Sequence, residues 1–302
     1  MRLNRLSDAL GQEIWTKRDD LTGFGVSGNK VRKLDYLLAD ALDQGADCVL
    51  TTGGLQSNHC RATSIAARQL GLEPGVLLRG ELPEIPDANL LLDRLVGATV
   101  RTCTAQQYRD HRDDLLAAWA DELRAAGRRP YVIPEGGSDA LGSLAYVDAA
   151  KELEDQAVRP FARVVVAVGS GGTLTGLALG CTNAFVHGVA VCDDAPYFEA
   201  RVQEIAAGTA QWGIAPLRSP GDGWEVTEGY QGPAYAVATD AIWDTIAWVA
   251  RLEGLLLDPV YTGKAMHALL CEVRAGRWTG PILFWHTGGA FGLFGRGHEL
   301  PA

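Results

Sequence analysis

The sequence lacks long hydrophobic runs, and this absence limits where the protein can work. Its longest apolar stretches, such as Val164–Val168 and Leu255–Leu257, are far shorter than the roughly 20 residues of a membrane-spanning helix. The basic start, Met1–Arg5, is not followed by the apolar segment of a signal peptide. We therefore expect a cytoplasmic protein with no membrane partner.

Clustered positive charge is scarce as well. The 302 residues include 27 Lys and Arg against 37 Asp and Glu, which gives a formal net charge of −10. Nucleic acids and anionic membranes bind clusters of basic residues, so we expect no nucleic-acid partner. The six cysteines are scattered, without a C-x-x-C pair or a Cys/His metal spacing, so we expect reduced thiols and no metal.

What the chain does contain is an alternation of short apolar strands and helical patterns. Strands that are apolar throughout and separated by helices are typical of parallel sheets covered on both faces. The length suggests two domains, so the sequence predicts an α/β protein with two domains of mainly parallel, twisted sheets covered by helices. The predicted strands are Gln12–Lys17, Cys48–Thr51, Gly75–Leu78, Thr99–Cys103, Pro130–Ile133, Arg163–Val168, Gly188–Cys192, Leu255–Leu257 and Pro281–Trp285.

A lysine at the start of a predicted helix is the first candidate for chemistry. The run from Ser27 to Leu34 leads into a helical pattern and places Lys30 in its first turn. The helix dipole disfavours a cation there, and Arg32 and Lys33 add positive field, so more of Lys30 is the neutral amine that attacks carbonyls. The hypothesis is a Schiff-base lysine, and the alternative is a basic patch on a solvated helix.

A glycine-rich loop after the strand Arg163–Val168 predicts a phosphate site. Glycines let backbone N–H groups converge, and the start of the following helix favours an anion. A dinucleotide pattern matches only in part, because its third glycine would fall on Leu174, but Asp193-Asp194 ends the next strand and keeps a nicotinamide-dependent enzyme open. A structural glycine turn is the other alternative. The loop comprises Gly169, Ser170, Gly171, Gly172 and Thr173.

A second polar loop, Gly53–His59, follows the strand Cys48–Thr51. Its amide, hydroxyl and imidazole groups, with the free N–H groups of a helix start, can hold a carboxylate. The alternative is a plain helix cap by Ser57 or Asn58.

Further hydroxyl groups lie near later strand ends. Thr287 follows the strand Pro281–Trp285, Tyr261 follows Leu255–Leu257, and Tyr230 lies in a glycine-containing loop. Ligands of doubly wound sheets gather outside the carboxyl ends of the strands, so each tyrosine is either an acid–base candidate or a half-buried structural ring.

Taken together, these motifs resemble one family. It is the pyridoxal-phosphate-dependent 1-aminocyclopropane-1-carboxylate deaminase / D-cysteine desulfhydrase family, which has the tryptophan-synthase-β-like fold (fold type II). The motifs occur in the family's order, from about Trp15 to Gly289. They are Gly28–Leu34, Gln56–His59, Gly169–Thr173, Leu257–Lys264 and His286–Gly289.

The resemblance implies pyridoxal 5'-phosphate as the cofactor and roles for individual residues. Lys30 would carry the cofactor, Asn58 would bond its ring hydroxyl, and Thr287 would lie at its pyridine nitrogen. The phosphate would be held by Gly169, Ser170, Gly171, Gly172 and Thr173. The substrate would lie among Gln56, Ser57, Asn58 and His59. The implied catalytic residues are Lys30, Ser57, Tyr230 and Tyr261.

The resemblance also implies a domain organisation and an assembly. Residues 33–138 would form a small inserted α/β domain, and residues 1–32 plus 139–302 the large cofactor-binding domain, with the active site between them. Homodimers are usual in such enzymes. Relatives usually have a Thr-Pro-Leu near the site, and this chain begins at Met1 just past it, so we expect one wall of the pocket to be affected.

The implied activity is elimination of a β-substituent from a small amino acid. The deaminases carry a glutamate after the second site tyrosine, whereas Thr262 follows Tyr261 here. A neutral hydroxyl favours loss of a good leaving group, so the expected reaction converts D-cysteine to pyruvate, sulfide and ammonia. Alternatives are deamination of the cyclopropane acid, loss of sulfite from cysteate or of chloride from β-chloroalanine, and, in a different class, a nicotinamide-dependent enzyme or a non-catalytic amino-acid- or cofactor-binding protein.

Overall fold

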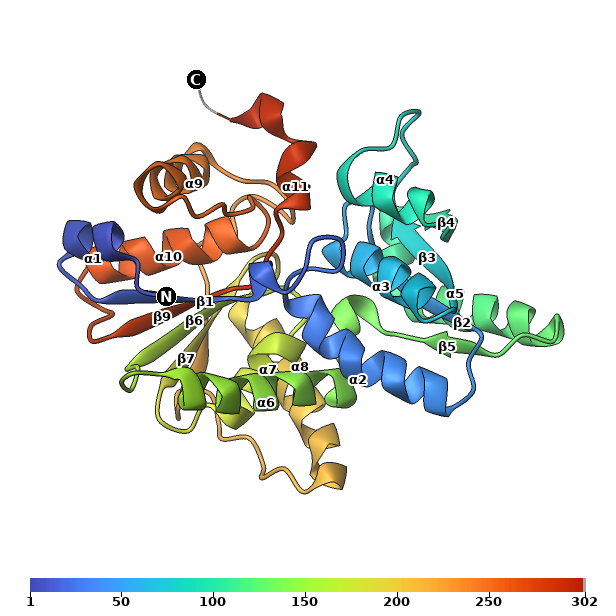
Figure 1. Cartoon of the computed structure of the whole chain (residues 1–302), viewed down its shortest axis with the longest axis horizontal. Coiled ribbons are helices and arrows are strands. Elements are labelled where there is room, and N and C mark those ends of the chain that lie inside the picture. Colours follow the sequence, from blue (N-terminus) through green and yellow to red (C-terminus); the bar gives the residue numbers. More distant parts are fainter. Residues whose placement is uncertain (301–302) are drawn as a thin grey trace.

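The computed structural model describes residues 1–300 and contains two parallel sheets (Figure 1). The larger has the strand order β1-β9-β6-β7-β8 and the smaller the order β4-β3-β2-β5. Every neighbouring pair runs parallel, which confirms the predicted architecture. The strands are β1 (Ile14–Arg18), β2 (Cys48–Gly54), β3 (Glu73–Arg79), β4 (Thr99–Cys103), β5 (Pro130–Val132), β6 (Arg163–Val168), β7 (Phe185–Ala190), β8 (Trp224–Thr227) and β9 (Ile282–His286).

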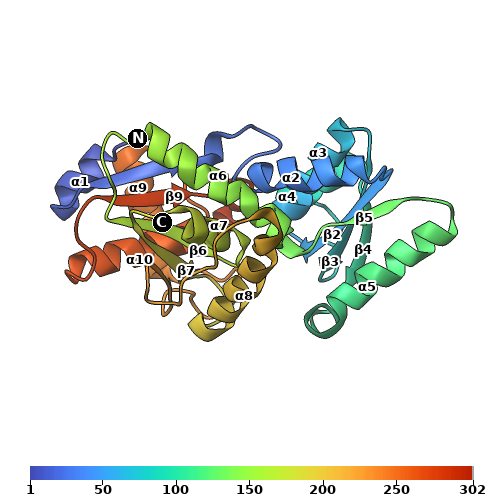
Figure 2. The same cartoon turned by 90° about the horizontal axis from the view of Figure 1, so that it is seen from below.

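Helices cover both faces of each sheet (Figure 2). In the larger sheet α6, α7 and α8 pack on one face and α1, α9 and α10 on the other. In the smaller sheet α2 and α3 pack on one face and α5 on the other. The helices are α1 (Asn4–Leu10), α2 (Asn29–Asp43), α3 (Asn58–Gln69), α4 (Ala88–Leu95), α5 (Ala105–Ala125), α6 (Ala140–Gln156), α7 (Gly172–Gly180), α8 (Ala195–Ala207), α9 (Asp240–Glu253), α10 (Thr262–Arg274) and α11 (Phe291–Phe294).

The central strand β6 shows why apolar runs form these sheets. Successive side chains of a strand point to opposite faces, so a strand covered on both sides needs apolar residues at every position. Val164 and Val166 pack toward α6 and α7, whereas Val165 packs toward α10, and all three are fully buried.

One predicted strand was wrong, and one observed strand was not predicted. The segment Leu255–Leu257 is not a strand: its two outer leucines enter the core, but the carbonyl of Leu256 accepts a hydrogen bond from the ring of His286 (2.9 Å) rather than from a neighbouring strand. The edge strand β8 was not predicted, because its four residues alternate apolar and polar side chains and carry a weak signal.

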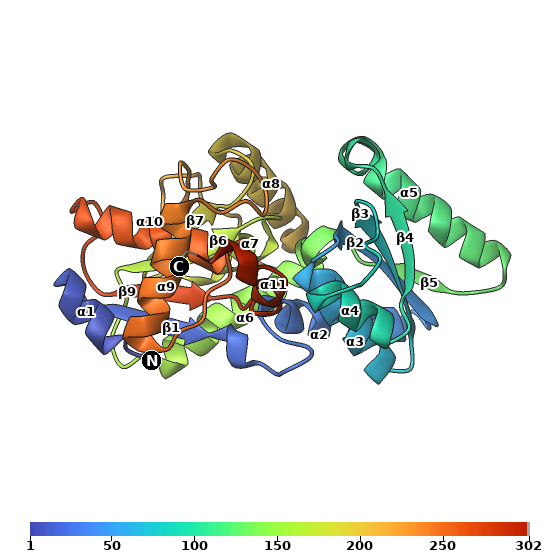
Figure 3. The same ribbon diagram turned by 90° about the horizontal axis from the view of Figure 1, so that it is seen from above.

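The two sheets lie side by side, with the short helix α11 reaching α4 of the smaller part (Figure 3). All strands of the smaller sheet fall between Cys48 and Val132. The predicted domain boundaries at residues 33 and 138 stay a prediction, and the first falls inside α2. Within residues 1–300, no helix is long and apolar enough to cross a membrane.

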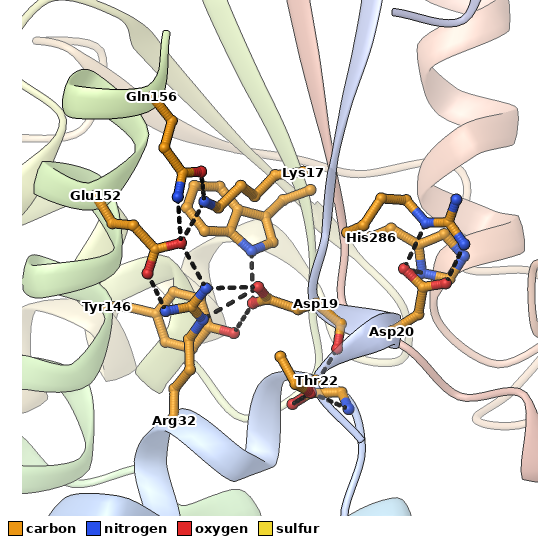
Figure 4. Close-up of polar contacts among 12 residues, drawn as sticks. Lys17, Asp19, Asp20, Thr22, Arg32, Tyr146, Glu152, Gln156 and His286 are labelled. Atoms are coloured by element: carbon orange, nitrogen blue, oxygen red, sulfur yellow. Dashed lines mark hydrogen bonds and ion pairs between the residues drawn. The ribbon is translucent and has the colours of Figure 1, made fainter. Parts of the chain in front are cut away.

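A buried carboxylate anchors the first turns of α2 (Figure 4). Asp19 is only 1% exposed, and its carboxylate accepts hydrogen bonds from Arg32 Nε (3.0 Å), Tyr146 OH (2.6 Å) and Trp285 Nε1 (2.8 Å). These donors come from α2, α6 and β9. Arg32 also donates to Glu152 of α6 (2.8 Å). One side chain thus ties three elements together next to Lys30.

The start of α2 also touches the end of β9 through the backbone. Asn29 N donates to the Thr287 carbonyl (3.0 Å), and a Cβ at Gly28 would lie 2.5 Å from the same oxygen. Gly28 has φ +86°, a conformation that side chains disfavour. Only glycine therefore allows this close approach.

We predict that Asp19→Ala lowers the free energy of unfolding by about 3–5 kcal/mol, because it leaves the guanidinium of Arg32 without its buried partner and strands two ring donors. Urea denaturation measures this loss. The exposed Asp8→Ala in α1 is the control and should change stability by less than about 0.5 kcal/mol. Equal losses in the two variants would contradict the anchoring role.

Candidate active site

A cavity lies at the carboxyl ends of the strands of both sheets. It contains most of the residues predicted from the sequence, but not Gln56, Gly172 or Tyr230. The predicted residues that line it are Lys30, Ser57, Asn58, His59, Gly169, Ser170, Gly171, Thr173, Tyr261 and Thr287. Unpredicted lining residues include Asn29, Glu135, Gly136 and Tyr235.

Lys30 projects from the first turn of α2 into this cavity. Its Nζ donates to the carbonyl of Gly136 (3.3 Å). Burial lowers the pKa of Lys30 to about 8, against the opposing charge of Glu135. The predicted direction is confirmed, although desolvation is the largest cause. The neutral amine, which attacks carbonyls, is therefore more populated near neutral pH than in an ordinary lysine.

Lys33, one helical turn further on, is buried rather than solvated. Its Nζ donates to Ser138 Oγ (3.0 Å) and to the Gly136 carbonyl (3.2 Å). Burial, followed by the nearby charge of Lys30, holds its pKa well below the usual value. Its spacing of three residues from Lys30 placed it on the same helix face, a signal that the sequence offered.

The glycine-rich loop joins β6 to α7 as predicted. A Cβ at Gly172 would lie 2.8 Å from Ser138 Oγ and 2.9 Å from Lys33 Nζ, so this position has no room for a side chain. Gly172 packs against these groups instead of lining the cavity. The loop is joined to α2 by a hydrogen bond from Asn29 Nδ2 to Thr173 Oγ1 (3.1 Å). The start of α7 therefore lies at the cavity wall, with Lys30 lining the cavity and Lys33 packed beneath the loop.

The loop Gly53–His59 closes the cavity from the smaller sheet. Ser57 caps α3 by accepting from Cys60 N (3.2 Å), so it is both a helix cap and a cavity residue. Asn58 Oδ1 and His59 Nδ1 are buried and have no partner among residues 1–300. Burial and the nearby lysines hold the pKa of His59 well below its usual range, so the imidazole is neutral.

Gln56 points away from the cavity, contrary to the predicted substrate contact. Its Nε2 donates to Asp87 Oδ1 (2.6 Å), and its Oε1 accepts from Asn89 N (2.9 Å) at the start of α4. The side chain therefore fixes the loop to α4. Gln56 holds its neighbours in place from outside the cavity.

Tyr235 lies where the sequence had suggested Tyr230. The hydroxyl of Tyr230 instead donates to Glu272, and its ring packs against His267 of α10. The hydroxyls of Tyr235 and Tyr261 lie 2.6 Å apart at the cavity wall. Burial raises the pKa of Tyr235 to about 12 and that of Tyr261 well above its usual value, so both are hydrogen-bond donors at neutral pH.

The two threonines singled out by the sequence differ in position. Thr287 lines the cavity at the end of β9. Thr262 is fully buried outside it, and its hydroxyl donates to Asp258 Oδ1 (2.7 Å). The hydroxyl of Thr262 is therefore committed to the start of α10.

Residues 1–288 match a family described as "Pyridoxal-phosphate dependent enzyme". The chain belongs to this family. Its cofactor is pyridoxal phosphate, and the cavity suits that group: it offers a lysine with a lowered pKa, helix-start N–H groups for a phosphate, and unpartnered polar atoms on Asn58 and His59. The nicotinamide-dependent and non-catalytic alternatives are thereby set aside.

The named relatives include both D-cysteine desulfhydrases and 1-aminocyclopropane-1-carboxylate deaminases. A D-cysteine desulfhydrase of Salmonella newport is 42% identical, over 97% of this chain and 91% of the relative. A putative 1-aminocyclopropane-1-carboxylate deaminase of Thermotoga maritima is also 42% identical, over 99% and 95%. A bifunctional enzyme of both names from Arabidopsis thaliana is 42% identical, over 96% and 75%.

Solved structures give the same picture. One titled as an ACC deaminase homologue superposes with a TM-score of 0.91 at 39% identity, covering 99% of this chain and 91% of that one. A serine racemase from Dictyostelium discoideum superposes with a TM-score of 0.65 at 18% identity, over 96% and 91%. The second likeness shows the shared fold alone.

We predict that Lys30→Ala abolishes the visible absorption band of the lysine-bound cofactor, because Lys30 is the only lysine that lines the cavity among residues 1–300. Borohydride reduction followed by peptide mass spectrometry should place the adduct of the wild type on Lys30. The exposed Lys151→Ala should keep both signals. An adduct on a different lysine of the wild type would refute the assignment.

We predict that Gly172→Ala weakens cofactor affinity by about tenfold or more, equivalent to about 1.4 kcal/mol for each factor of ten. The added Cβ has to displace Ser138 or Lys33 beneath the loop. Equilibrium titration of the apoenzyme measures the affinity. Gly292→Ala, where a Cβ meets nothing within 4 Å, is the control, and equal affinities in the two variants would exclude the phosphate loop.

Proposed function

We propose that the protein is a D-cysteine desulfhydrase, which converts D-cysteine and water to pyruvate, hydrogen sulfide and ammonia. The observation that carries the proposal is the neutral, buried Thr262, bonded to Asp258, at the position where the deaminases carry a glutamate. The named relatives are compatible with either activity, so the proposal rests on this difference at the start of α10, next to the cavity residue Tyr261.

The cofactor would be held by residues from both sheets. Lys30 would carry it, the Gly169–Thr173 loop would bind its phosphate, Asn58 its ring hydroxyl and Thr287 its pyridine nitrogen. The Nζ of Lys33 lies beneath the same loop, close to Gly172 and bonded to Ser138. When bound, pyridoxal phosphate supplies a conjugated system that withdraws electrons from the α-carbon of an amino acid.

The substrate carboxylate would lie at the start of α3. Ser57, Asn58 and His59 offer a hydroxyl, an amide and backbone N–H groups there. The neutral His59 adds no positive charge, so hydrogen bonds and the field of the helix start hold the carboxylate. This orients the α-hydrogen without fixing the side chain of the amino acid.

Two sets of groups move protons in the proposed reaction. Lys30, with its lowered pKa, would accept the α-proton as a free amine. The tyrosine pair keeps its protons at neutral pH, so Tyr235 or Tyr261 can donate a hydrogen bond to the departing thiolate. A thiolate is a good leaving group because the pKa of a free cysteine thiol is about 8.5.

The charge of the cavity also bears on the choice of substrate. Glu135 lines the cavity, and its charge is the largest one that acts to raise the pKa of Lys30. A carboxylate there repels a second anionic group on the substrate. Cysteate, which carries a sulfonate, should therefore be a poorer substrate than D-cysteine.

The domain division of residues 33–138 from 1–32 plus 139–302, a homodimeric assembly and a cytoplasmic location belong to the same proposal. The placement of all smaller-sheet strands between Cys48 and Val132 supports the division. The net charge of −10 suits a protein without a nucleic-acid partner.

We predict sulfide and pyruvate release from D-cysteine, slower release from L-cysteine, little from cysteate and negligible 2-oxobutanoate from 1-aminocyclopropane-1-carboxylate. The four substrates are compared side by side with saturating cofactor. Ring opening places charge on carbon and needs a charged or acidic group that Thr262 does not provide. Faster ring opening than sulfide release would return the deaminase to first place.

A matched pair of variants tests the substrate site within that assay. Ser57→Ala should raise KM for D-cysteine while the cofactor absorption stays intact. Because Ser57 also caps α3, Thr104→Ala, which removes the cap of α5 at an exposed site, controls for the loss of a helix cap. A similar rise in KM for both variants would remove Ser57 from the substrate site.

A further inference from the structure

The loop between β8 and α9, residues 228–239, carries Tyr235 to the cavity but has little structure of its own. Its internal hydrogen bonds include Val237 N to the Ala234 carbonyl (3.1 Å) and Gly229 N to Gln231 Oε1 (2.7 Å). Ala236, next to Tyr235, has φ +59°, a conformation that costs energy in a residue with a side chain. The loop therefore needs support from outside to hold its tyrosine in place.

That support comes from a buried lysine. Lys264 is fully buried in the first turn of α10, and its Nζ donates to the carbonyls of Gln231 (2.6 Å), Val191 (3.0 Å) and Ala234 (3.2 Å). An ammonium has three N–H donors, so all of them are used. Two of the three carbonyls belong to the loop, and Ala234 directly precedes Tyr235.

The burial of Lys264 costs free energy that its surroundings offset only in part. Among residues 1–300 it has no carboxylate within ion-pair distance, and burying a cation without one is unfavourable. Burial lowers its pKa to about 8, with Cys192 and Asp258 opposing the shift and Arg296 adding to it. The group is thus still mostly charged at neutral pH, and the groups that bond it directly are carbonyls rather than a carboxylate.

Lys264 and Tyr261 also lie within one turn of the same helix start. Tyr261 precedes α10, and Lys264 follows it by three residues. The ammonium therefore fixes the Tyr235 loop relative to the element that carries the other tyrosine. The hydrogen bond of 2.6 Å between the hydroxyls of Tyr235 and Tyr261 joins the loop to the start of α10.

We propose that Lys264 is a positioning residue that holds Tyr235 against Tyr261, and that its three carbonyls form a monovalent-cation site filled by the chain's own ammonium. Backbone carbonyl oxygens bind K⁺ and ammonium ions by the same chemistry. A variant that loses the lysine should therefore accept an external cation. The part played by the tyrosine pair in elimination rests on the proposed function, whereas the cation site does not.

The first test is structural and needs no turnover. In the Lys264→Ala holoenzyme, amides of residues 228–239 should exchange with deuterium about tenfold faster than in the wild type. The substitution removes the atoms of n-propylammonium, so this ion should restore slow exchange in a saturable way, and K⁺ should do so in part. The uncharged isostere n-propanol should not, and the exposed Lys151→Ala should exchange like the wild type.

The second test is kinetic. Lys264→Ala should lower kcat for D-cysteine by about tenfold with a smaller change in KM, and n-propylammonium should restore it. Because the lysine acts through Tyr235, the double variant Lys264→Ala/Tyr235→Phe should be no slower than Tyr235→Phe alone. Lys264→Met, which keeps the apolar volume, should behave like Lys264→Ala and replaces it if the smaller side chain prevents folding.

Three results would overturn the proposal. Unchanged exchange in residues 228–239 would remove the positioning role, and equal rescue by n-propanol would reduce the site to packing. Fully additive losses in the double variant would show that Lys264 does not act through Tyr235. A wild type inactive on D-cysteine would refute the proposed function, while the exchange experiment would still decide for or against the cation site.

Discussion

The contact between the start of α2 and the end of β9 is the constraint on which the cavity depends. Gly28 approaches the Thr287 carbonyl more closely than any side chain would allow, and Asn29 binds that carbonyl through its backbone. The carboxylate of Asp19 also fixes the first turns of α2, because it accepts a hydrogen bond from Arg32. Lys30 and Thr287 therefore lie at fixed positions on one wall of the cavity, held by contacts that do not involve the smaller sheet.

This anchoring explains how a lysine can be reactive without being loose. A helix whose first turn is held by a buried carboxylate and by backbone contacts loses little further freedom when it binds a cofactor. The carboxylate lies behind the helix and bonds Arg32, Tyr146 and Trp285 rather than Lys30. Lys30 keeps its lowered pKa because the anion that steadies its helix does not reach its amine.

The sequence predicted the parts of the site that depend on local patterns. Lys30 at a helix start and the Gly169–Thr173 loop each have a signal within a few residues, and the structure brings both to one cavity. Tyr235 could not be told from Tyr230 because both lie in one irregular loop, and only the tertiary contacts of Lys264 and Glu272 decide which ring faces the cavity. The prediction for Gln56 was wrong for a similar reason. Its partners at the start of α4 are about thirty residues further along the chain, so no local pattern indicates the contact.

Two buried lysines, Lys264 and Lys33, differ in whether the protein itself satisfies all of their hydrogen-bond donors. A lysine with every donor satisfied has a structural role, whereas one with a spare donor can bind a ligand. Lys264 and Lys33 both lack a carboxylate within ion-pair distance in residues 1–300, and both bind backbone carbonyls. The three donors of Lys264 are matched by three carbonyls, so it needs no ligand to be complete. Lys33 has only the Gly136 carbonyl and the Ser138 hydroxyl as partners, so its protonated form would have one donor over. Its Nζ lies under Gly172 at the start of α7, where an anion is most favoured. A phosphate there would supply the charge and the acceptor that the protein itself withholds from Lys33.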